Sequence, residues 1–336
     1  MPHLLSGPGN LPKAMLLTLL ALLVLGGCRN PWYLIVQPAR LWVSVPAQRR
    51  IYELDREGLR TTLGSVGLEA APGRLAWSSA TRQVVAVLPE ARAVTLIDPD
   101  TFRIVRTAGI QGTGQDVAVS SSGLTAFVLL PDDKAVALVN LRDGTVRRMN
   151  LPGSARPVVL ASPKVSREEA WVVSEDGRID VVSDGSLQAS TTPLSQLQRP
   201  LRALADAQGG IVLLDGPSST LIRLSAPRGD SATRQGIGGV SGGGAPADCA
   251  LAPDGSAGIT FPDAGRMVRL EPDGKNLAYA TGANGCRAIV ADARGFHVAH
   301  EAGNQVFSLT WSGSTLLAAR LVDTLPGPPV AMIALD

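Results

Sequence analysis

Short apolar runs separated by polar turns recur along most of the chain. The unit is an apolar strand, a polar and often glycine-containing turn, and a second apolar strand. Its clearest copies are residues 74–87 (RLAWSSATRQVVAV), 116–129 (DVAVSSSGLTAFVL) and 248–261 (DCALAPDGSAGITF), and weaker copies begin at 157, 202 and 287. The copies start at intervals of roughly 40 to 46 residues, the length of one blade of a β-propeller.

Each copy continues with two further strand-like segments, such as 93–98 (AVTLID) and 102–109 (FRIVRTAG) after the first. Four short strands separated by turn residues are the content of one blade. Six complete units run from Arg74 to about residue 323, and residues 41–45, 50–55 and 59–63 supply three outer strands without an inner one. The last segment, 330–336 (VAMIALD), matches an inner strand alone. The sequence therefore predicts an all-β fold, a seven-bladed β-propeller closed by a C-terminal strand that joins the N-terminal blade. Residues 33–36 (YLIV) are an alternative inner strand for that blade.

Residues 93–129 (AVTLIDPDTFRIVRTAGIQGTGQDVAVSSSGLTAFVL) resemble the YVTN family of β-propellers. The shared pattern is a strand ending in Ile-Asp, a Thr-containing turn, a second strand, and then Val-Ala-Val-Ser. The resemblance is good over 41–150 and 245–282 and degenerate over 157–236. It implies the propeller architecture and says little about function, because one fold carries many functions.

The first 28 residues have the pattern of a targeting segment. Lys13 precedes a 12-residue apolar run, 14–25, which is too short to cross a bilayer and is followed by Gly26, Gly27 and Cys28. The string Leu-Gly-Gly-Cys resembles the bacterial lipobox. That resemblance implies a signal peptide over 1–27 and a mature N-terminal Cys28 that carries fatty acyl chains such as palmitate. We then expect a tether over 28–40 and the propeller over 41–336.

Residue 29 is Arg rather than the Asp that typically keeps a lipoprotein at the inner membrane. By the same resemblance we expect the protein in the cell envelope, at the outer membrane or the cell surface. The membrane is then its first partner, reached through the lipid anchor.

Charge and candidate ligands exclude several function classes. The formal net charge is +2 with both signs interspersed, which gives no basic patch for nucleic acid. His297 and His300 are three apart on one predicted strand and point to opposite faces, so we expect no metal site there. Turns such as 253–255 (PDG) are ordinary turn chemistry rather than calcium ligands. No nucleophile elbow, P-loop or zinc-protease motif is present, and we predict no catalytic residues, metal or cofactor.

Charged residues recur just before the innermost strand of successive units, where a propeller has the mouth of its central channel. They are Arg74, Asp116, Arg156, Arg202, Asp248 and Arg287. Such a ring is a candidate site for a small anionic ligand or a loop of a partner protein. The alternative is that these residues pair with one another across neighbouring blades, Arg74 with Asp116, and Asp248 with Arg202 and Arg287.

Once Cys28 is lipidated, Cys249 and Cys286 are the two thiols left, in an oxidising compartment. One opens an inner strand and the other precedes the inner strand of the next unit, so we predict a disulfide between them. Two separate buried thiols are the alternative.

The predicted function is a lipid-anchored propeller of the cell envelope that binds a ligand or an envelope protein rather than catalysing a reaction. Two alternatives stay open. One is a propeller enzyme of the lactonase or sugar-dehydrogenase type, which would need acidic and Asn ligands in the channel. The other is an assembly factor for envelope proteins, which would need an edge or groove that captures strands. The glycine-rich stretch 236–244 is expected to be a surface loop at the same mouth.

Overall fold

The propeller is formed by the unit Ala39–Asp336 of the chain, in a computed structural model. The residues that the structure describes are 40–55, 62–153, 155–164, 168–183, 186–191, 194, 197–226, 232–237, 244–280, 285–312 and 315–335. Cys28, residues 33–36 and most of the glycine-rich stretch (238–243) lie outside these ranges. Within them, no helix is both long and apolar enough to span a membrane.

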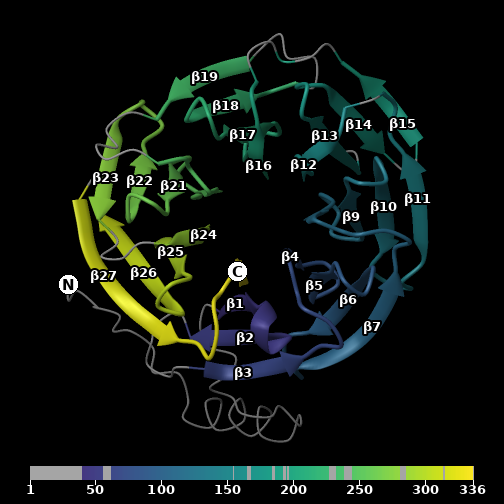
Figure 1. The fold of residues 1–336 in the computed structure, drawn as a ribbon, viewed down its shortest axis with the longest axis horizontal. Helices are drawn as coiled ribbons and strands as arrows, with labels where there is room; N and C mark the ends of the chain where they lie inside the picture. Colours follow the sequence, from purple (N-terminus) through teal and green to yellow (C-terminus); the bar gives the residue numbers. More distant parts are fainter. Residues whose placement is uncertain are drawn as a thin grey trace, which may run out of the picture. The chain divides into compact units, whose positions relative to one another are not determined.

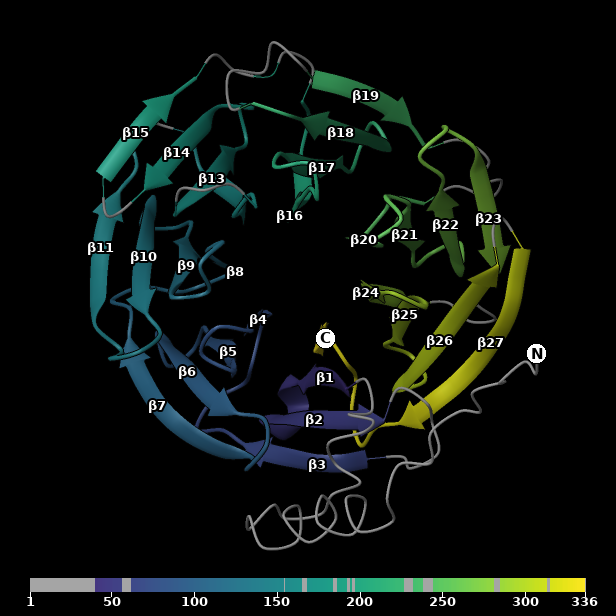
Figure 2. The same ribbon diagram turned by 180° about the vertical axis from the view of Figure 1, so that it is seen from behind.

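The fold is all-β and consists of seven antiparallel sheets of four strands, arranged as blades around a ring (Figures 1 and 2). Blades are numbered here in chain order, and strands are given from the centre outward. Blade 1 is β28 (Ala331–Leu335), β1 (Arg40–Val45), β2 (Arg50–Asp55) and β3 (Thr62–Gly67). Blade 2 is β4 (Leu75–Ser78), β5 (Gln83–Leu88), β6 (Ala93–Asp98) and β7 (Arg103–Gly109). Blade 3 is β8 (Asp116–Val119), β9 (Thr125–Leu130), β10 (Ala135–Asn140) and β11 (Val146–Asn150).

The other four blades follow the same order. Blade 4 is β12 (Pro157–Ala161), β13 (Glu169–Ser174), β14 (Ile179–Ser183) and β15 (Ser186–Ser190). Blade 5 is β16 (Pro200–Ala205), β17 (Ile211–Asp215), β18 (Thr220–Leu224) and β19 (Ala232–Gly236). Blade 6 is β20 (Asp248–Leu251), β21 (Ala257–Phe261), β22 (Arg266–Leu270) and β23 (Asn276–Ala280). Blade 7 is β24 (Cys286–Asp292), β25 (Gly295–His300), β26 (Gln305–Ser312) and β27 (Thr315–Thr324).

The predicted ring closure is confirmed. The C-terminal strand β28 pairs antiparallel with β1, in a register that runs from Arg40 opposite Leu335 to Ser44 opposite Ala331. The inner position of blade 1, for which 33–36 was the alternative, is therefore held by β28. Two boundaries differ from the prediction. Arg40, assigned to the tether, is the buried first residue of β1, and the outer strand of blade 1 continues to Gly67 rather than ending at 63; residues 59–61 of the predicted strand lie outside the described residues.

The core lies between blades rather than in one central mass. The two middle strands of a blade are buried on both faces, as β5 (QVVAVL) and β10 (AVALVN) show, because neighbouring sheets cover them. Val85 and Val87 of blade 2 share one apolar cluster with Val128 of blade 3. The outermost strands face solvent, and β7 has five consecutive exposed residues.

One tight turn recurs between the second and third strands of a blade. In four copies the N–H of the fourth residue donates to the carbonyl of an initial proline, and the fourth residue is left-handed: Pro46–Arg49 (φ 49°), Pro89–Arg92 (φ 50°), Pro131–Lys134 (φ 46°) and Pro262–Gly265 (φ 58°). The first copy contains the 3-10 helix η2 (Pro46–Gln48). In the first three copies the left-handed residue then accepts at its carbonyl from the residue after the outermost strand: Leu68, Ile110 and Leu151. This latch ties the outer edge of each of these blades to its turn.

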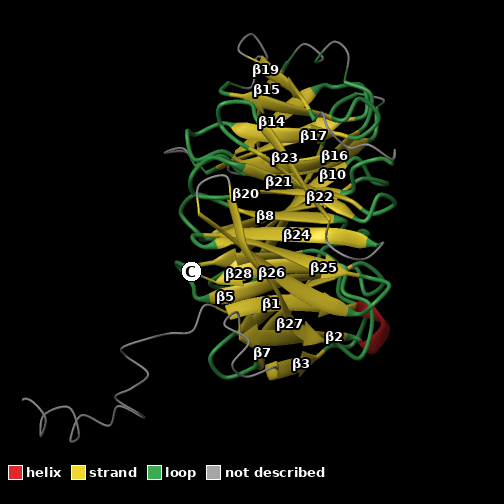
Figure 3. Ribbon diagram, turned by 90° about the vertical axis from the view of Figure 1, so that its left-hand side faces the viewer, coloured by secondary structure: helices red, strands yellow, loops and turns green. Residues whose placement is uncertain are grey.

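The two faces of the ring differ in the residues they present. The ring face is the one where inner strands begin, at Arg74, Asp116 and Asp248, and it also bears η2. The serine face is the one where inner strands end, at Ser78 and Leu335. Figure 3 shows η2 and the C-terminus on opposite sides of the propeller.

Candidate functional site

Four of the six predicted channel-mouth residues form one ionic network. Arg202 of β16 donates to Asp116 of β8 (Nη1 to Oδ1, 3.0 Å), and its Nε lies 3.4 Å from Asp248 Oδ1 on β20. The other oxygen of Asp248 accepts from Arg74 Nη1 at 3.3 Å. Blades 2, 3, 5 and 6 are thereby joined through side chains that cross the central channel.

The network is buried and electrically balanced. The side chains of Asp248, Asp116 and Arg202 are 3%, 8% and 18% exposed. Burial by itself would lower the pKa of Arg202, but the carboxylates of Asp116 and Asp248 outweigh it and raise that pKa above its ordinary value. Two guanidinium groups face two carboxylates, so the network has no net charge with which to attract an anion.

The other two predicted residues do not join this network. Arg156 pairs with Asp132 of its neighbouring turn (2.9 Å), and Arg287 pairs with Glu301 (2.5 Å), both at exposed positions. The predicted pairing of adjacent blades is also corrected for Arg74, whose ion pair is with Asp248 rather than with Asp116. Arg74 lies at the channel, so its long side chain reaches across the channel to blade 6 instead of sideways to the neighbouring blade 3.

Beyond Arg202, the channel widens toward the serine face. A small cavity of about 200 Å³ is lined by the inner strands of blades 2 to 5 and has Arg202 among its walls. It shares Trp77, Val119, Ser162 and Ala205 with a larger hollow of about 600 Å³. This serine-lined hollow is formed by Trp77, Ser78, Ser79, Val119, Ser120, Ser121, Gly123, Ser162, Lys164 and Ala205. The ion-paired side chains thus cross the channel near the ring face, and the channel is hollow at the serine face.

The serines of the hollow have two roles. Ser78 and Ser162 are buried and donate to the carbonyls of Gly123 and Glu169, both at 2.6 Å, which holds the turns in place. Ser79 and Ser121 are exposed, as is Lys164, and Trp77 is half-buried beside them. The Ser79 hydroxyl, the Lys164 ammonium and the Trp77 indole are the groups that the hollow offers to a ligand.

The hollow was not predicted from the sequence, although the repeat contains a signal for it. Ser78, Ser120 and Ser162 recur at an interval of 42 residues, each at or just after the end of an inner strand. Aligning the repeats by this position rather than by the charged one before the strand would have marked the serine face. Lys164 has no counterpart in the other copies and was not identifiable from the repeat.

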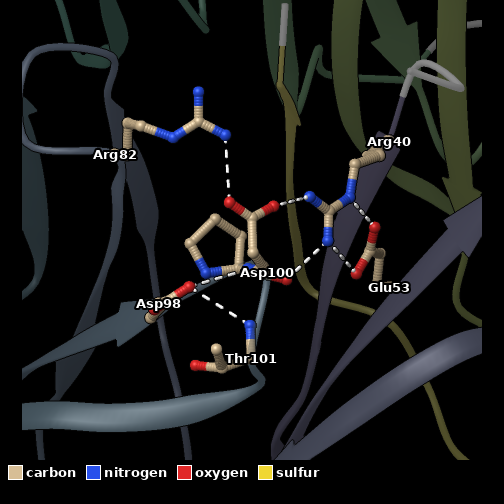
Figure 4. Close-up of polar contacts among 7 residues, drawn as sticks. Arg40, Glu53, Arg82, Asp98, Asp100 and Thr101 are labelled. Atoms are coloured by element: carbon tan, nitrogen blue, oxygen red, sulfur yellow. Dashed lines mark hydrogen bonds and ion pairs between the residues drawn. The ribbon is translucent and has the colours of Figure 1, made fainter. Parts of the chain in front are cut away.

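A second ionic cluster lies on the serine face, between blades 1 and 2 (Figure 4). Arg40, at the start of β1, forms a bidentate pair with buried Glu53 and donates to Asp100 Oδ1 at 2.8 Å. Asp100 also accepts from Arg82 at 3.0 Å, and its own N–H donates to Asp98 within a tight turn. We call Arg40, Glu53, Arg82 and Asp100 the Arg40 clasp.

The clasp sets opposite pKa directions on its two paired acids. Burial raises the pKa of Glu53 above its ordinary value, despite the opposing hydrogen bond and charge of Arg40. Burial would also raise the pKa of Asp100, but hydrogen bonds from Arg82 and Arg40 outweigh it and hold that pKa below its ordinary value. Arg40 therefore contacts two acids whose pKa values are shifted in opposite directions, that of Glu53 upward and that of Asp100 downward.

A cavity of about 410 Å³ lies between the turns of blades 6 and 7, but the charges that line it are paired. Arg269 lies 2.9 Å from Asp254 and stacks 5.1 Å from the Trp311 ring centre.

The two histidines of blade 7 have separate partners. Asp292 contacts buried His297 at 2.6 Å, while His300 Nδ1 accepts from the N–H of Gly303. Among the described residues, no group of three His, Cys, Asp or Glu side chains has the arrangement of a metal site. Asp254 caps the N–H of Ser256 in its Pro-Asp-Gly turn, which agrees with ordinary turn chemistry.

The predicted disulfide is absent, and Cys249 and Cys286 are two separate buried thiols. Successive residues of β20 point to opposite faces of the sheet. Cys249 packs toward blade 5 in the cluster of Val212 and Leu214, whereas Ala250 belongs to the cluster of Cys286 and Phe296. Cys249 therefore points away from Cys286. Burial, and secondarily the charge of Asp248, raises the pKa of the Cys249 thiol.

No family model and no curated protein sequence matches the chain, so the resemblance to the YVTN propellers stays a prediction. Solved structures do match. A protein from Lactobacillus plantarum has a TM-score of 0.71 at 14% identity, covering 89% of this chain and 100% of its own. The periplasmic gluconolactonase PpgL of Pseudomonas aeruginosa has a TM-score of 0.70 at 14% identity, covering 89% and 99%. Virginiamycin B lyase from Staphylococcus aureus has a TM-score of 0.63 at 14% identity, covering 74% and 83%. At such identities the likeness shows the fold, a seven-bladed propeller whose structural neighbours include a lactonase and a lyase.

Proposed function

We propose that this protein is a lipid-anchored propeller of the cell envelope that binds a small polar ligand in the serine-lined hollow. The anchor is Cys28, and the ligand is rich in hydroxyl groups and has at most one phosphate group. Exposed Ser79 would exchange hydrogen bonds with it, Lys164 would meet its charge, and Trp77 would cover its apolar side.

The observation that carries this proposal is the contrast between the two ends of the channel. The charged groups near the ring face saturate one another, and an anion there would have to compete with ion pairs already made. The hollow, in contrast, presents exposed polar groups around a volume of about 600 Å³. Pockets of this size hold small ligands.

A hydrolase of the lactonase type is the second candidate, because a gluconolactonase is among the structural neighbours. Its carboxylates would have to be Asp116 or Asp248, the acids of the channel. Both already accept hydrogen bonds from backbone N–H groups and from arginines, which leaves neither poised as a base. Gluconolactone hydrolysis that disappears in Asp248→Asn, with the fold intact, would favour this candidate instead.

Fractionation of cells tests the anchor. Wild-type protein is expected in the membrane fraction and Cys28→Ala in the soluble fraction. A Cys28→Ala protein that stays wholly with the membrane contradicts the anchor.

Calorimetric titration tests the site. Glycerol phosphate and glucose are suitable probes, since both are rich in hydroxyls and have at most one phosphate. We expect saturable binding of one of them to Cys28→Ala protein. Binding should be lost when Ser79→Trp fills the hollow and kept in the matched control Ala91→Trp, an exposed ring-face position of the same blade. The absence of saturable binding by either probe, or binding that survives Ser79→Trp, contradicts the proposed site.

A further inference from the structure

The small cavity that opens into the serine-lined hollow has a charged wall. Of the described side chains that line it, Arg202 alone is charged, and the others are apolar or aromatic except for Ser162. The hydroxyl of Ser162 is already used, because it donates to the carbonyl of Glu169 at 2.6 Å. A ligand that passes from the hollow into the cavity therefore meets the guanidinium of Arg202 as its polar side-chain contact.

Arg202 is fixed by two acids, yet one of its nitrogens makes no hydrogen bond. Nη1 donates to Asp116 Oδ1 at 3.0 Å, and Nε lies 3.4 Å from Asp248 Oδ1. Nη2 donates to none of the described residues, and it is not sealed from open space as Nε is. The open space that Arg202 borders is the small cavity, so the N–H groups of Nη2 are donors for whatever enters it.

The charge of Arg202 is balanced, although its donors are not all used. The side chains of Asp116 and Asp248 are 8% and 3% exposed and lie beside the same guanidinium. A carboxylate in the cavity would be attracted by Arg202 and repelled by both acids, and repulsion between like charges is strong where water is excluded. An uncharged oxygen accepts the same hydrogen bond without this repulsion. Because the two acids hold the guanidinium in place, its donors are also preorganised for such an oxygen.

We propose that Nη2 of Arg202 binds an uncharged oxygen of the ligand, a hydroxyl or carbonyl oxygen, at the inner end of the hollow. This inference rests on the proposed binding site and adds which chemical group that site selects. The phosphate of the ligand stays at Lys164, which is exposed in the larger hollow, and the uncharged end enters the cavity of about 200 Å³. A ligand whose inner end is a carboxylate is rejected.

A matched pair of sugar phosphates tests this selectivity. Glucose 1-phosphate and glucuronate 1-phosphate share the ring and the phosphate, and they differ at carbon 6, where one has a hydroxymethyl group and the other a carboxylate. In calorimetric titration of Cys28→Ala protein we expect the glucose derivative to bind roughly tenfold more tightly, the effect of one hydrogen bond to a charged donor. Equal affinity, or tighter binding of the glucuronate derivative, overturns the proposal.

Filling the small cavity tests where the uncharged end lies. Ala118 is half-buried and lines this cavity but not the larger hollow. Ala291, the matched control, is a half-buried alanine of the inner strand β24 that lines neither space. We expect Ala118→Leu to weaken binding of glucose 1-phosphate roughly tenfold and Ala291→Leu to leave it unchanged, with the melting temperature as the check on folding. Unchanged binding in folded Ala118→Leu protein overturns the proposal.

Arg202→Lys tests the guanidinium itself. The change keeps a cation beside Asp116 and Asp248 and removes Nη2. We expect the folded variant to bind glucose 1-phosphate no better than glucuronate 1-phosphate, and a preference that persists overturns the role of Arg202. If this variant does not fold, the sugar phosphate pair and Ala118→Leu decide the question.

Failure of this inference is distinct from failure of the proposed site. Saturable binding of glucose or glycerol phosphate that Ser79→Trp abolishes supports the site. Glucose 1-phosphate that then fails to bind overturns the role of Arg202 alone. The absence of saturable binding by every probe, or binding that survives Ser79→Trp, contradicts the site itself and this inference with it.

Discussion

Arg74 and Asp248 belong to blades 2 and 6, as far apart in the ring as two of seven blades can be, and their side chains meet at 3.3 Å. Arg202 completes the crossing from blade 5 by approaching both Asp248 and Asp116. Neighbouring blades of a propeller are held by apolar packing, which acts only between adjacent sheets. Through the pairs Arg74–Asp248 and Arg202–Asp116, the ionic network therefore links blades that share no apolar interface directly.

Replacing Arg202 by Met should destabilise the propeller strongly. The change leaves the buried carboxylate of Asp116 without its cation and removes one of two cations from Asp248. Breaking a buried ion pair from one side costs about 3–5 kcal/mol. The free energy of unfolding in urea measures it.

Arg287→Met is the matched control, since Arg287 and Glu301 form an exposed pair that contributes at most about 1 kcal/mol. The triple change Arg202→Met, Asp116→Asn, Asp248→Asn should recover part of the loss, because neither buried carboxylate is left without its cation. Equal effects of Arg202→Met and Arg287→Met would mean that the network does not stabilise the ring.

Removing residues 330–336 should open the ring. β28 contributes a five-pair ladder to β1 and buries Ala331, Met332 and Leu335. Each ladder hydrogen bond contributes about 0.5–1.5 kcal/mol, and the bare edge of β1 invites strand-to-strand aggregation. Thermal unfolding and light scattering should show a lower melting temperature and aggregation. Addition of the 330–336 peptide in trans should reverse both, and a truncated protein as stable as the parent would exclude this closure.

Asp100→Asn should destabilise the protein at neutral pH and cost less in acid. The pKa of Asp100 in the folded protein lies below the ordinary 3.8, so the unfolded chain takes up the proton first as the pH falls. The stabilisation from this carboxylate is thus complete above 3.8 and is lost as the pH falls through the folded-state pKa. Urea unfolding of both proteins as a function of pH should give a difference that shrinks below 3.8.

Glu53→Gln provides a contrast of opposite sign. The pKa of Glu53 is raised in the folded state, so the folded protein holds the proton more firmly than the unfolded chain just above the ordinary 4.5. The contribution of this carboxyl to stability therefore falls as the pH rises from 4.5 through the folded-state pKa. The same pH dependence for both variants would contradict the assigned directions.

Cys249 and Cys286 should be inert in the folded protein and reactive after unfolding. Both thiols are buried, and burial raises the pKa of Cys249 and so suppresses its thiolate. Without reductant, an alkylating reagent is expected to modify neither cysteine in native buffer and both in denaturant, as read by mass spectrometry. Unmodified cysteines in denaturant without reductant would instead indicate the disulfide that the sequence suggested.

The sequence by itself determined the seven-bladed fold and its closure. Both follow from local patterns: each repeat of about 42 residues contains four short apolar runs separated by turn residues, which is the content of one propeller blade. The C-terminal segment is an inner strand without outer partners, and the N-terminal segment supplies outer strands without an inner one. The two segments therefore complete one blade together.

Only the tertiary structure decided which charged residues meet. Arg74, Arg156 and Arg287 occupy comparable places in their repeats, yet Arg74 crosses the channel while the other two pair locally at exposed positions. Side-chain reach across a ring depends on distances that no linear spacing encodes. The disulfide prediction was wrong for a related reason. A shift of one residue along β20 turns a side chain from one neighbouring blade to the other, and Cys249 faces the blade that does not contain Cys286. The serine-lined hollow arises in the same way, because residues of blades 2 to 5 become neighbours only once the blades have closed into a ring.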